Sequence, residues 1–210
     1  GTDTGGSVRE PAGCCGCVGL RPSYGAVSRF GMIAYASSMD TVGTLSATVA
    51  DAAALLRILQ RPSPRDATSA AAKPFSGCPE IDPTALRIGV LAPEHPQTAA
   101  AARALQRRGA HVFPARFDAL SVCADVYESI ALCEATLNLG RFDGIRFGAD
   151  APQPTGNALS VLPSLCGLPA LAVPFGREAG GLCGSVTLCG AAFSEGLLLS
   201  LGMLLEQEGK

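Results

Sequence analysis

Residues 86–113 contain the pattern that most constrains the fold of this chain. Residues 86–91, Leu-Arg-Ile-Gly-Val-Leu, are rich in branched apolar side chains and predict a strand. The alanine-rich residues 98–108 predict a helix that ends at Gly109, and residues 110–113 predict a second strand. A strand, a helix and a strand in this order form a β-α-β unit whose strands run parallel. The sequence therefore favours an α/β fold.

A second helix is predicted after residue 48. Thr48 followed by Asp51 resembles a capping box, and Pro62 ends the segment. Four apolar side chains of this helix are expected to face the core: Leu55, Leu56, Ile58 and Leu59. Residues 1–45, by contrast, are glycine-rich and are expected to form loops and strand ends.

The second half of the chain continues the alternation. Residues 119–139 predict a long helix, and residues 169–174 and 185–188 predict short core strands. A last helix begins at Ser194 and Glu195. It is expected to turn four leucines inward: Leu197, Leu198, Leu201 and Leu204. The predicted class is α/β, with one mixed sheet flanked by helices and built from the segments around Val18, Ile88, Val112, Leu171 and Val186.

Composition limits the kind of protein. The 210 residues are 48% hydrophobic and 16% charged, which favours one domain with a buried core over disorder. The formal net charge of −2 gives no basic field that would attract RNA or a membrane surface. Residues 197–205 form the longest apolar run, which is too short to span a bilayer and predicts a buried helix.

Nine cysteines include the closely spaced Cys14, Cys15 and Cys17. An odd number of cysteines, without a recognisable signal peptide, favours reduced thiols in a cytoplasmic protein. A zinc site would need a fourth ligand, and His95 and His111 are the only histidines, so no metal site is expected. We expect Cys15 to be a small buried thiol.

The first twelve residues carry the chemistry. Ser7 follows a Gly-Gly pair and precedes an arginine. Glycines leave the backbone unshielded, so successive N–H groups can converge on one point beside the serine hydroxyl, as an oxyanion hole for acyl transfer requires. An ordinary glycine-rich turn would also explain Gly-Gly-Ser alone.

Several blocks that follow match the motifs of one known family in the same order. They are Cys15-Gly16, residues 19–25, residues 37–40 and Val42-Gly43. Together with the first block, they resemble the amidase signature family, in which G-[ST]-D-x-G-G-S-[IV]-R-x-P precedes C-G-x-x-G-L-[KR]-P-[ST]. Within it, the likeness is greatest to the A subunits of aspartyl/glutamyl-tRNA amidotransferases. It is strong over residues 1–69, moderate over 85–148, and returns at 167–174.

The resemblance implies a partial amidase signature domain over residues 1–210. Its three regions are a nucleophile-loop region (1–69), a β-α-β and helical region (85–150) and C-terminal core strands with a helix (157–210). The first motif is internal in the family, and a large block is missing between Asp150 and Asn157. We therefore expect truncation at the N-terminus and an internal deletion.

The resemblance also assigns roles around Ser7, which matches the nucleophile. Backbone N–H groups of three residues match the oxyanion hole: Thr4, Gly5 and Gly6. Asp3 and Arg9 are implied to fix the loop, with a direct substrate role for Arg9 as the alternative. A further block is implied to lie near the site, with a capped turn as the alternative: Ser37, Ser38 and Asp40.

The family activates its serine with a buried lysine and a bridging serine, which both lie upstream of the matching motif. Lys73 and Lys210 are the only lysines in this sequence, and neither is placed to replace that base. For glutamine, the position that should hold the α-amino group falls on Asn157, an amide instead of a carboxylate. Phe147 stands where a tyrosine would be more usual.

The implied function is hydrolysis of glutamine through an acyl-serine, which supplies ammonia for amidating misacylated Glu-tRNA(Gln) or Asp-tRNA(Asn). The implied partners are the amidotransferase B and C subunits; ATP and magnesium belong to the partner, and tRNA is met only through the complex. No cofactor is expected in this chain. Two alternatives remain: a stand-alone amidase acting on small amides, and a catalytically inactive scaffold.

Overall fold

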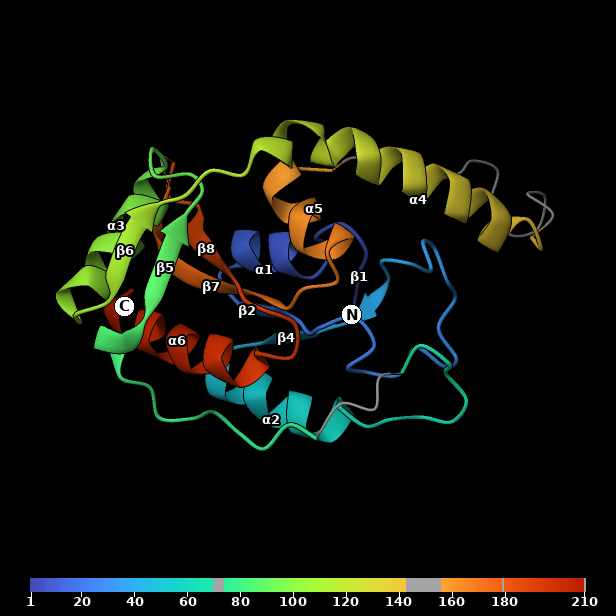
Figure 1. Ribbon diagram of the computed structural model, residues 1–210, viewed down its shortest axis with the longest axis horizontal. Helices are drawn as coiled ribbons and strands as arrows, with labels where there is room; N and C mark the ends of the chain where they lie inside the picture. Colours follow the sequence, from blue (N-terminus) through green and yellow to red (C-terminus); the bar gives the residue numbers. More distant parts are fainter. Residues whose placement is uncertain (70–73, 143–155, 179, 210) are drawn as a thin grey trace.

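A four-stranded antiparallel sheet lies at the centre of the computed structural model, which describes residues 1–69, 74–142, 156–178 and 180–209 (Figure 1). Its strands, in spatial order, are β4 (Thr44–Ser46), β2 (Val18–Arg21), β7 (Ala170–Arg177) and β8 (Cys183–Cys189). Every residue of β2 is buried, so this strand has no face towards solvent. Helices must therefore cover both sides of the sheet.

The two faces of the sheet are covered by different helices. Leu20 of β2 pairs with Leu171 of β7, and both lie in the core cluster that includes residues of α2 (Val49–Leu59) and α6 (Glu195–Glu208). Gly19 faces the other way, towards α1 (Arg9–Cys15). A Cβ on Gly19 would lie 2.6 Å from the Cβ of Ala12, so only glycine lets α1 approach this closely.

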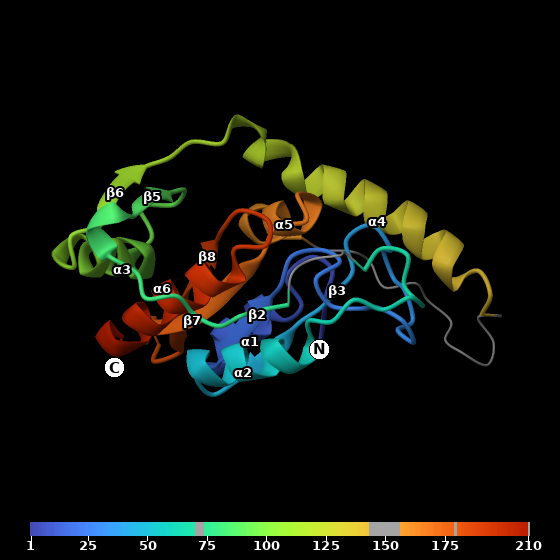
Figure 2. The same cartoon turned by 60° about the horizontal axis from the view of Figure 1, so that its bottom comes forward.

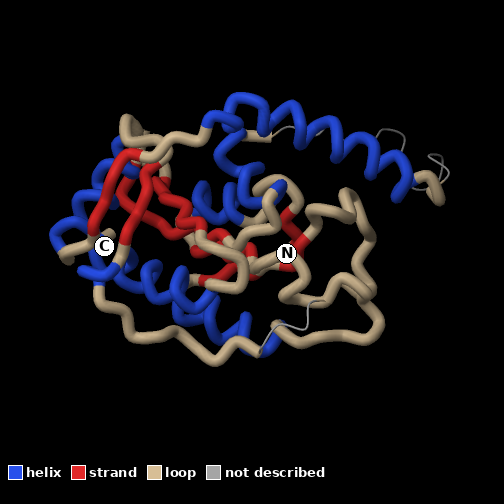
Figure 3. Tube along the Cα trace, viewed as in Figure 1, coloured by secondary structure: helices blue, strands red, loops and turns tan. Residues whose placement is uncertain are grey.

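The predicted β-α-β unit is confirmed. It consists of β5 (Arg87–Val90), α3 (Pro96–Arg107) and β6 (His111–Pro114), and its strands pair in parallel. The predicted α/β class, with sheets flanked by helices, is confirmed as well. The expectation that Ile88 and Val112 belong to the same sheet as Val18, Leu171 and Val186 is wrong, because β5 and β6 form a separate two-stranded sheet (Figure 3). The unit joins the core through buried side chains of α3, Ala101, Ala104 and Leu105.

A second, smaller core lies under the long helix α4 (Cys123–Leu139), which follows η2 (Asp118–Val122) and runs along one edge of the molecule (Figure 2). Beneath it lies α5 (Ala158–Leu165). Buried residues from three distant segments form this cluster: Ala36, Met39, Cys123, Tyr127, Ala131 and Val161.

Several local predictions need correction. Thr48 caps α2 by accepting a hydrogen bond from the Asp51 amide at 3.1 Å, as predicted. The expected inward face is wrong, because Leu56 is buried whereas Ile58 is 64% exposed. Leu55 and Leu59 are exposed too, as is Leu197 of α6, whereas Leu198 and Leu201 are buried. Val49, Ala52 and Leu56 supply the inward face of α2, because residues three, four and seven positions apart lie on one side of a helix.

The glycine-rich start of the chain is more regular than expected. β1 (Thr2–Asp3) pairs antiparallel with β3 (Thr41–Val42), and α1 follows the Ser7 loop. Gly16 ends α1 with φ +68°, a left-handed conformation that favours glycine. A short 3-10 turn, η1 (Pro83–Ala85), precedes β5. In the described ranges, no helix combines the length and hydropathy that crossing a membrane would require.

Candidate active site

A buried carboxylate organises the loop that carries Ser7. Asp3 ends β1 and has no exposed surface. Its Oδ1 accepts a hydrogen bond from the Gly6 amide at 3.0 Å, and its Oδ2 accepts one from the Val8 amide at 3.2 Å. Two alternate N–H groups of the loop are therefore turned inward, on either side of Ser7.

Two buried arginines surround the same carboxylate. Arg9 donates from Nε to Oδ2 at 3.0 Å and from Nη2 to Oδ1 at 2.9 Å, which makes a bidentate pair. Arg21 of β2 donates to the Asp3 carbonyl and lies 3.3 Å from Oδ1, while its Nη2 donates to the Met39 carbonyl at 2.8 Å. Asp3 and Arg9 thus hold the loop from within.

The electrostatics keep these groups charged. Burial alone would raise the pKa of Asp3, but the charges of Arg9 and Arg21 and the hydrogen bond from Val8 outweigh it, so the pKa is lowered. Burial lowers the pKa of Arg21 to about 10, which still leaves a cation at neutral pH. One anion therefore faces two cations in a site closed to solvent.

Ser7 itself is exposed at the turn before α1. Within the described residues, the amides of Thr4, Gly5 and Ser7 donate no hydrogen bond, so they are free to face a ligand. The prediction that the Gly6 amide belongs to the oxyanion hole needs correction, because its N–H donates to the Asp3 carboxylate. Its φ of +131° is open to glycine and is what turns that amide inward.

Tyr127 of α4 packs directly on Gly5. A Cβ on Gly5 would lie 2.5 Å from the Tyr127 hydroxyl, so this contact requires a glycine at position 5. Burial raises the pKa of Tyr127 to about 12, which keeps the hydroxyl protonated at neutral pH. Sequence reasoning missed this residue, because nothing local connects position 127 to position 5.

α5 closes the other side of the loop. Arg9 donates from Nη1 to the Ser160 carbonyl at 2.8 Å and from Nη2 to the Ser164 hydroxyl at 3.1 Å. Asn157, the predicted amino-group ligand, is the N-cap of α5, and its Oδ1 accepts from the Leu159 amide at 3.0 Å. It is exposed, and its carbonyl oxygen already has this helix-capping partner.

The predicted block at 37–40 divides between two structural roles. Asp40 is buried and accepts hydrogen bonds from the Thr4 hydroxyl at 2.6 Å and the Tyr35 amide at 2.8 Å, so it supports the loop. The side-chain amide of Asn138 in α4 donates a hydrogen bond to the Ser37 hydroxyl at 3.0 Å, and the Ser38 backbone amide donates one to Glu134 at 2.9 Å. Phe147, Lys73 and Lys210 lie outside the described residues.

The cysteines do not form the expected packing. Cys14 and Cys15 are exposed and Cys17 is half-buried, so the prediction of a buried Cys15 is wrong. α1 turns its Ala12 face towards the sheet, which leaves the side of Cys15 towards solvent. In the part of the chain that the structure describes, no three His, Cys, Asp or Glu side chains gather as a metal site.

Comparison with known proteins gives matches to one family. The sequence model of the family described as Amidase matches residues 1–159. The chain is 38% identical over 166 residues to the A subunit of the glutamyl-tRNA(Gln) amidotransferase of Solidesulfovibrio magneticus, covering 73% of this chain and 34% of that relative. It is 44% identical over 162 residues to the protein of the same name from Myxococcus xanthus, covering 72% and 33%.

A solved structure gives the same picture. The crystal structure of the A subunit of the glutamyl-tRNA(Gln) amidotransferase from Thermotoga maritima matches with a TM-score of 0.83 at 25% identity, covering 100% of this chain and 62% of that chain. In sequence, the chain spans about a third of the length of the curated relatives it matches.

Proposed function

The chain belongs to the amidase family, and from this premise we propose that Ser7 is the nucleophile that attacks a carboxamide in the complete protein. The proposed substrate is glutamine, and the proposed use of the ammonia is the amidation of Glu-tRNA(Gln) or Asp-tRNA(Asn). The names of the relatives support this choice. The observation that carries it is an exposed Ser7 beside amides that the protein leaves unbonded.

The chemistry follows from the loop. The Ser7 oxygen forms a bond to the amide carbon as its hydroxyl proton passes to the base, the carbon–nitrogen bond breaks, and the nitrogen leaves as ammonia after taking up that proton from the base. Water then hydrolyses the acyl ester and restores the serine. In both steps the carbonyl oxygen gains negative charge, which the amides of Thr4, Gly5 and Ser7 would stabilise. Because Asp3 holds the intervening amides, these donors are positioned before substrate binds.

A serine hydroxyl needs a base to become an efficient nucleophile. The residue types that the resemblance implies are a buried lysine and a bridging serine. The residues that the structure describes contain no lysine, so the base is part of the proposal for the complete protein. The partners are likewise proposed: the B and C subunits in the cytoplasm, with ATP, magnesium and tRNA bound outside this chain.

The test is ammonia release by the complete gene product that contains this chain. Replacement Ser7→Ala should lower the rate with glutamine by more than about 10³-fold, because removing a serine nucleophile costs at least that much. Ser160→Ala is the matched control, since Arg9 contacts only the carbonyl of that residue, and it should keep most of the activity. An unchanged rate in Ser7→Ala would refute the assignment.

The substrate is tested separately. Glutamine and a simple aliphatic amide are compared with the same preparation. Faster release from glutamine supports the amidotransferase proposal. Ser7-dependent release from the aliphatic amide alone would replace it with a stand-alone amidase.

A further inference from the structure

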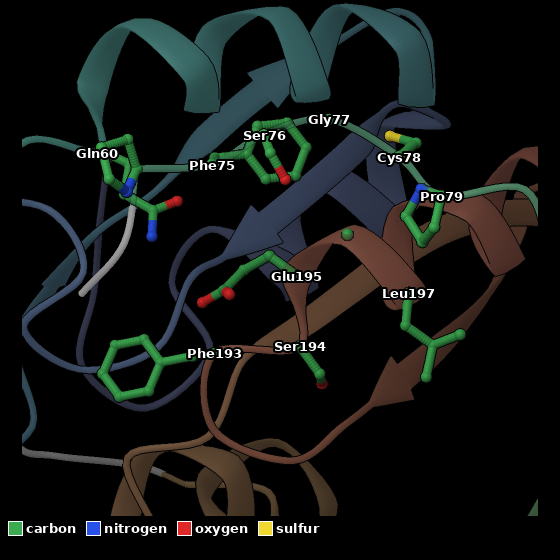
Figure 4. Close-up of a pocket in the computed structure, with 12 residues that line it drawn as sticks. Gln60, Phe75, Ser76, Gly77, Cys78, Pro79, Phe193, Ser194, Glu195 and Leu197 are labelled. Carbon is green, nitrogen blue, oxygen red and sulfur yellow. The ribbon is translucent and has the colours of Figure 1, made fainter.

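A pocket of about 630 Å³ lies between the end of α2, residues 74–79 and the start of α6 (Figure 4). None of its lining residues belongs to the Ser7 loop. Its size is in the range of small-molecule sites, which combine mostly apolar walls with a few convergent polar groups. The polar groups of this pocket indicate what kind of ligand it suits.

Gln60 supplies the first polar group. It is only 5% exposed and follows the last turn of α2. Its Oε1 is buried and accepts no hydrogen bond from the described residues. An unpaired buried acceptor is costly, and native proteins retain few of them. Figure 4 shows the amide of Gln60 directed into the pocket, where a ligand could donate to it.

Glu195 supplies the second polar group. It is 2% exposed, and its Oε1 accepts a hydrogen bond from the Ser23 amide at 2.8 Å. Its second oxygen accepts none from the described part of the chain. In Figure 4 its carboxylate extends into the same space as the Gln60 amide. The two side chains thus offer converging acceptors.

The side chains that line this pocket suit a ligand that has an apolar group next to a cation. Phe75 and Phe193 present aromatic rings, and Leu197 adds an aliphatic wall. Phe193 is held at φ +61° and its amide donates to the Ser23 hydroxyl at 2.7 Å, so its backbone is fixed, while half of its side chain stays exposed. Among the described residues that line the pocket, Glu195 is the only charged one. Aromatic faces and a carboxylate both attract a cation and disfavour an anion.

We propose that this pocket binds a primary alkylammonium. The ammonium has three donors and no acceptor, and it would donate to Oε1 of Gln60 and to the free oxygen of Glu195. Its alkyl chain would lie against the ring of Phe75. This binding site is independent of amide hydrolysis by Ser7, because it uses none of the residues of that loop.

The experiment titrates the purified complete protein that contains this chain with n-butylammonium chloride and follows the heat of binding. Saturable binding is expected, and n-butanol, which has the same chain without the charge, should bind far more weakly. Gln60→Leu should weaken n-butylammonium binding by about tenfold, the effect of losing one hydrogen bond to a charged group. Its melting temperature should not fall, because the substitution removes an unpaired acceptor.

The matched control is Gln97→Leu. Gln97 is also buried with an unpaired Oε1, but it lies outside this pocket and near Gly184. This variant should bind n-butylammonium as the native chain does. Equal affinity in Gln60→Leu and the native chain, or no saturable binding to the native chain, would overturn the proposal.

A second measurement locates the ligand. Cys78 lines the pocket and is half-buried, and burial raises the pKa of its thiol, so we expect it to react more slowly than an exposed cysteine. Saturating n-butylammonium should slow alkylation of Cys78 further, as measured on the Cys78 peptide by mass spectrometry, and leave the exposed Cys133 unaffected. Equal slowing at both cysteines would contradict binding in the pocket.

Discussion

The Ser7 loop and the β5-α3-β6 unit are held to the same core by different forces. The loop depends on charges: Asp3, Arg9 and Arg21 form ion pairs with at most 1% of any side chain exposed. The unit depends on apolar packing of α3, and its ion pairs to Glu208 are on the surface. Apolar packing fixes where an element lies, whereas the charged network also fixes which way each loop amide points.

This difference should appear as a difference in sensitivity. A buried ion pair adds little stability over apolar side chains of the same shape, but removing one partner leaves an uncompensated charge inside the protein. Surface pairs are screened by water and salt, so their loss is small. The loop should therefore respond strongly to single changes that the unit tolerates.

The largest effect is expected for Asp3→Leu. This change leaves Arg9 and Arg21 buried without an anion and frees the amides of Gly6 and Val8. Loss of one partner of a buried pair costs about 3–5 kcal/mol. Urea unfolding of the purified chain measures it. A loss below about 1 kcal/mol would mean that the network does not hold the loop.

A smaller effect is expected from acid. The pKa of Asp3 is lower in the folded chain than the roughly 3.9 of an unfolded aspartate, so its stabilisation is present above that value and is lost as pH falls towards the folded pKa. Unfolding free energies of the native chain and Asp3→Asn should therefore converge below about pH 4. The difference should persist in high salt, because Asp3 is buried. Parallel pH profiles for the two proteins would be evidence against this linkage.

The smallest effect is expected for Glu208→Gln. This residue accepts hydrogen bonds from Arg107 at 3.2 Å and from Arg108 at 2.9 Å, all at the surface. Thermal unfolding should change little, and any change should vanish in high salt because exposed charges are screened. A loss comparable to that of Asp3→Leu would remove the contrast between the two regions.

Local signals were enough to predict part of this architecture. The capping of α2 by Thr48 and the strand-helix-strand pattern of residues 86–113 both depend on residues that are close in sequence, so both could be predicted from the sequence. α5 was not predicted, because Pro163 inside it normally argues against a helix. The separation of β5 and β6 from the central sheet depends on packing of α3, which no local pattern encodes.

The candidate site divides in the same way. Asp3, Ser7 and Arg9 lie within a few residues of each other, and their motif was enough to single them out. Tyr127 and Ser160 reach the loop from more than a hundred residues away. Asn157 could be placed only by counting from a distant motif, and its role as a helix cap follows from three-dimensional context.

The alternate bonding of the loop amides also determines how this segment exchanges hydrogen with water. The N–H groups of Gly6 and Val8 are bonded to a carboxylate that solvent does not reach. Those of Gly5 and Ser7 are unbonded within the described structure. Deuterium should therefore enter this stretch in a slow-fast alternation, a pattern normally associated with one edge of a β-strand. The turn thus has the alternating amide protection of an edge strand without being part of one.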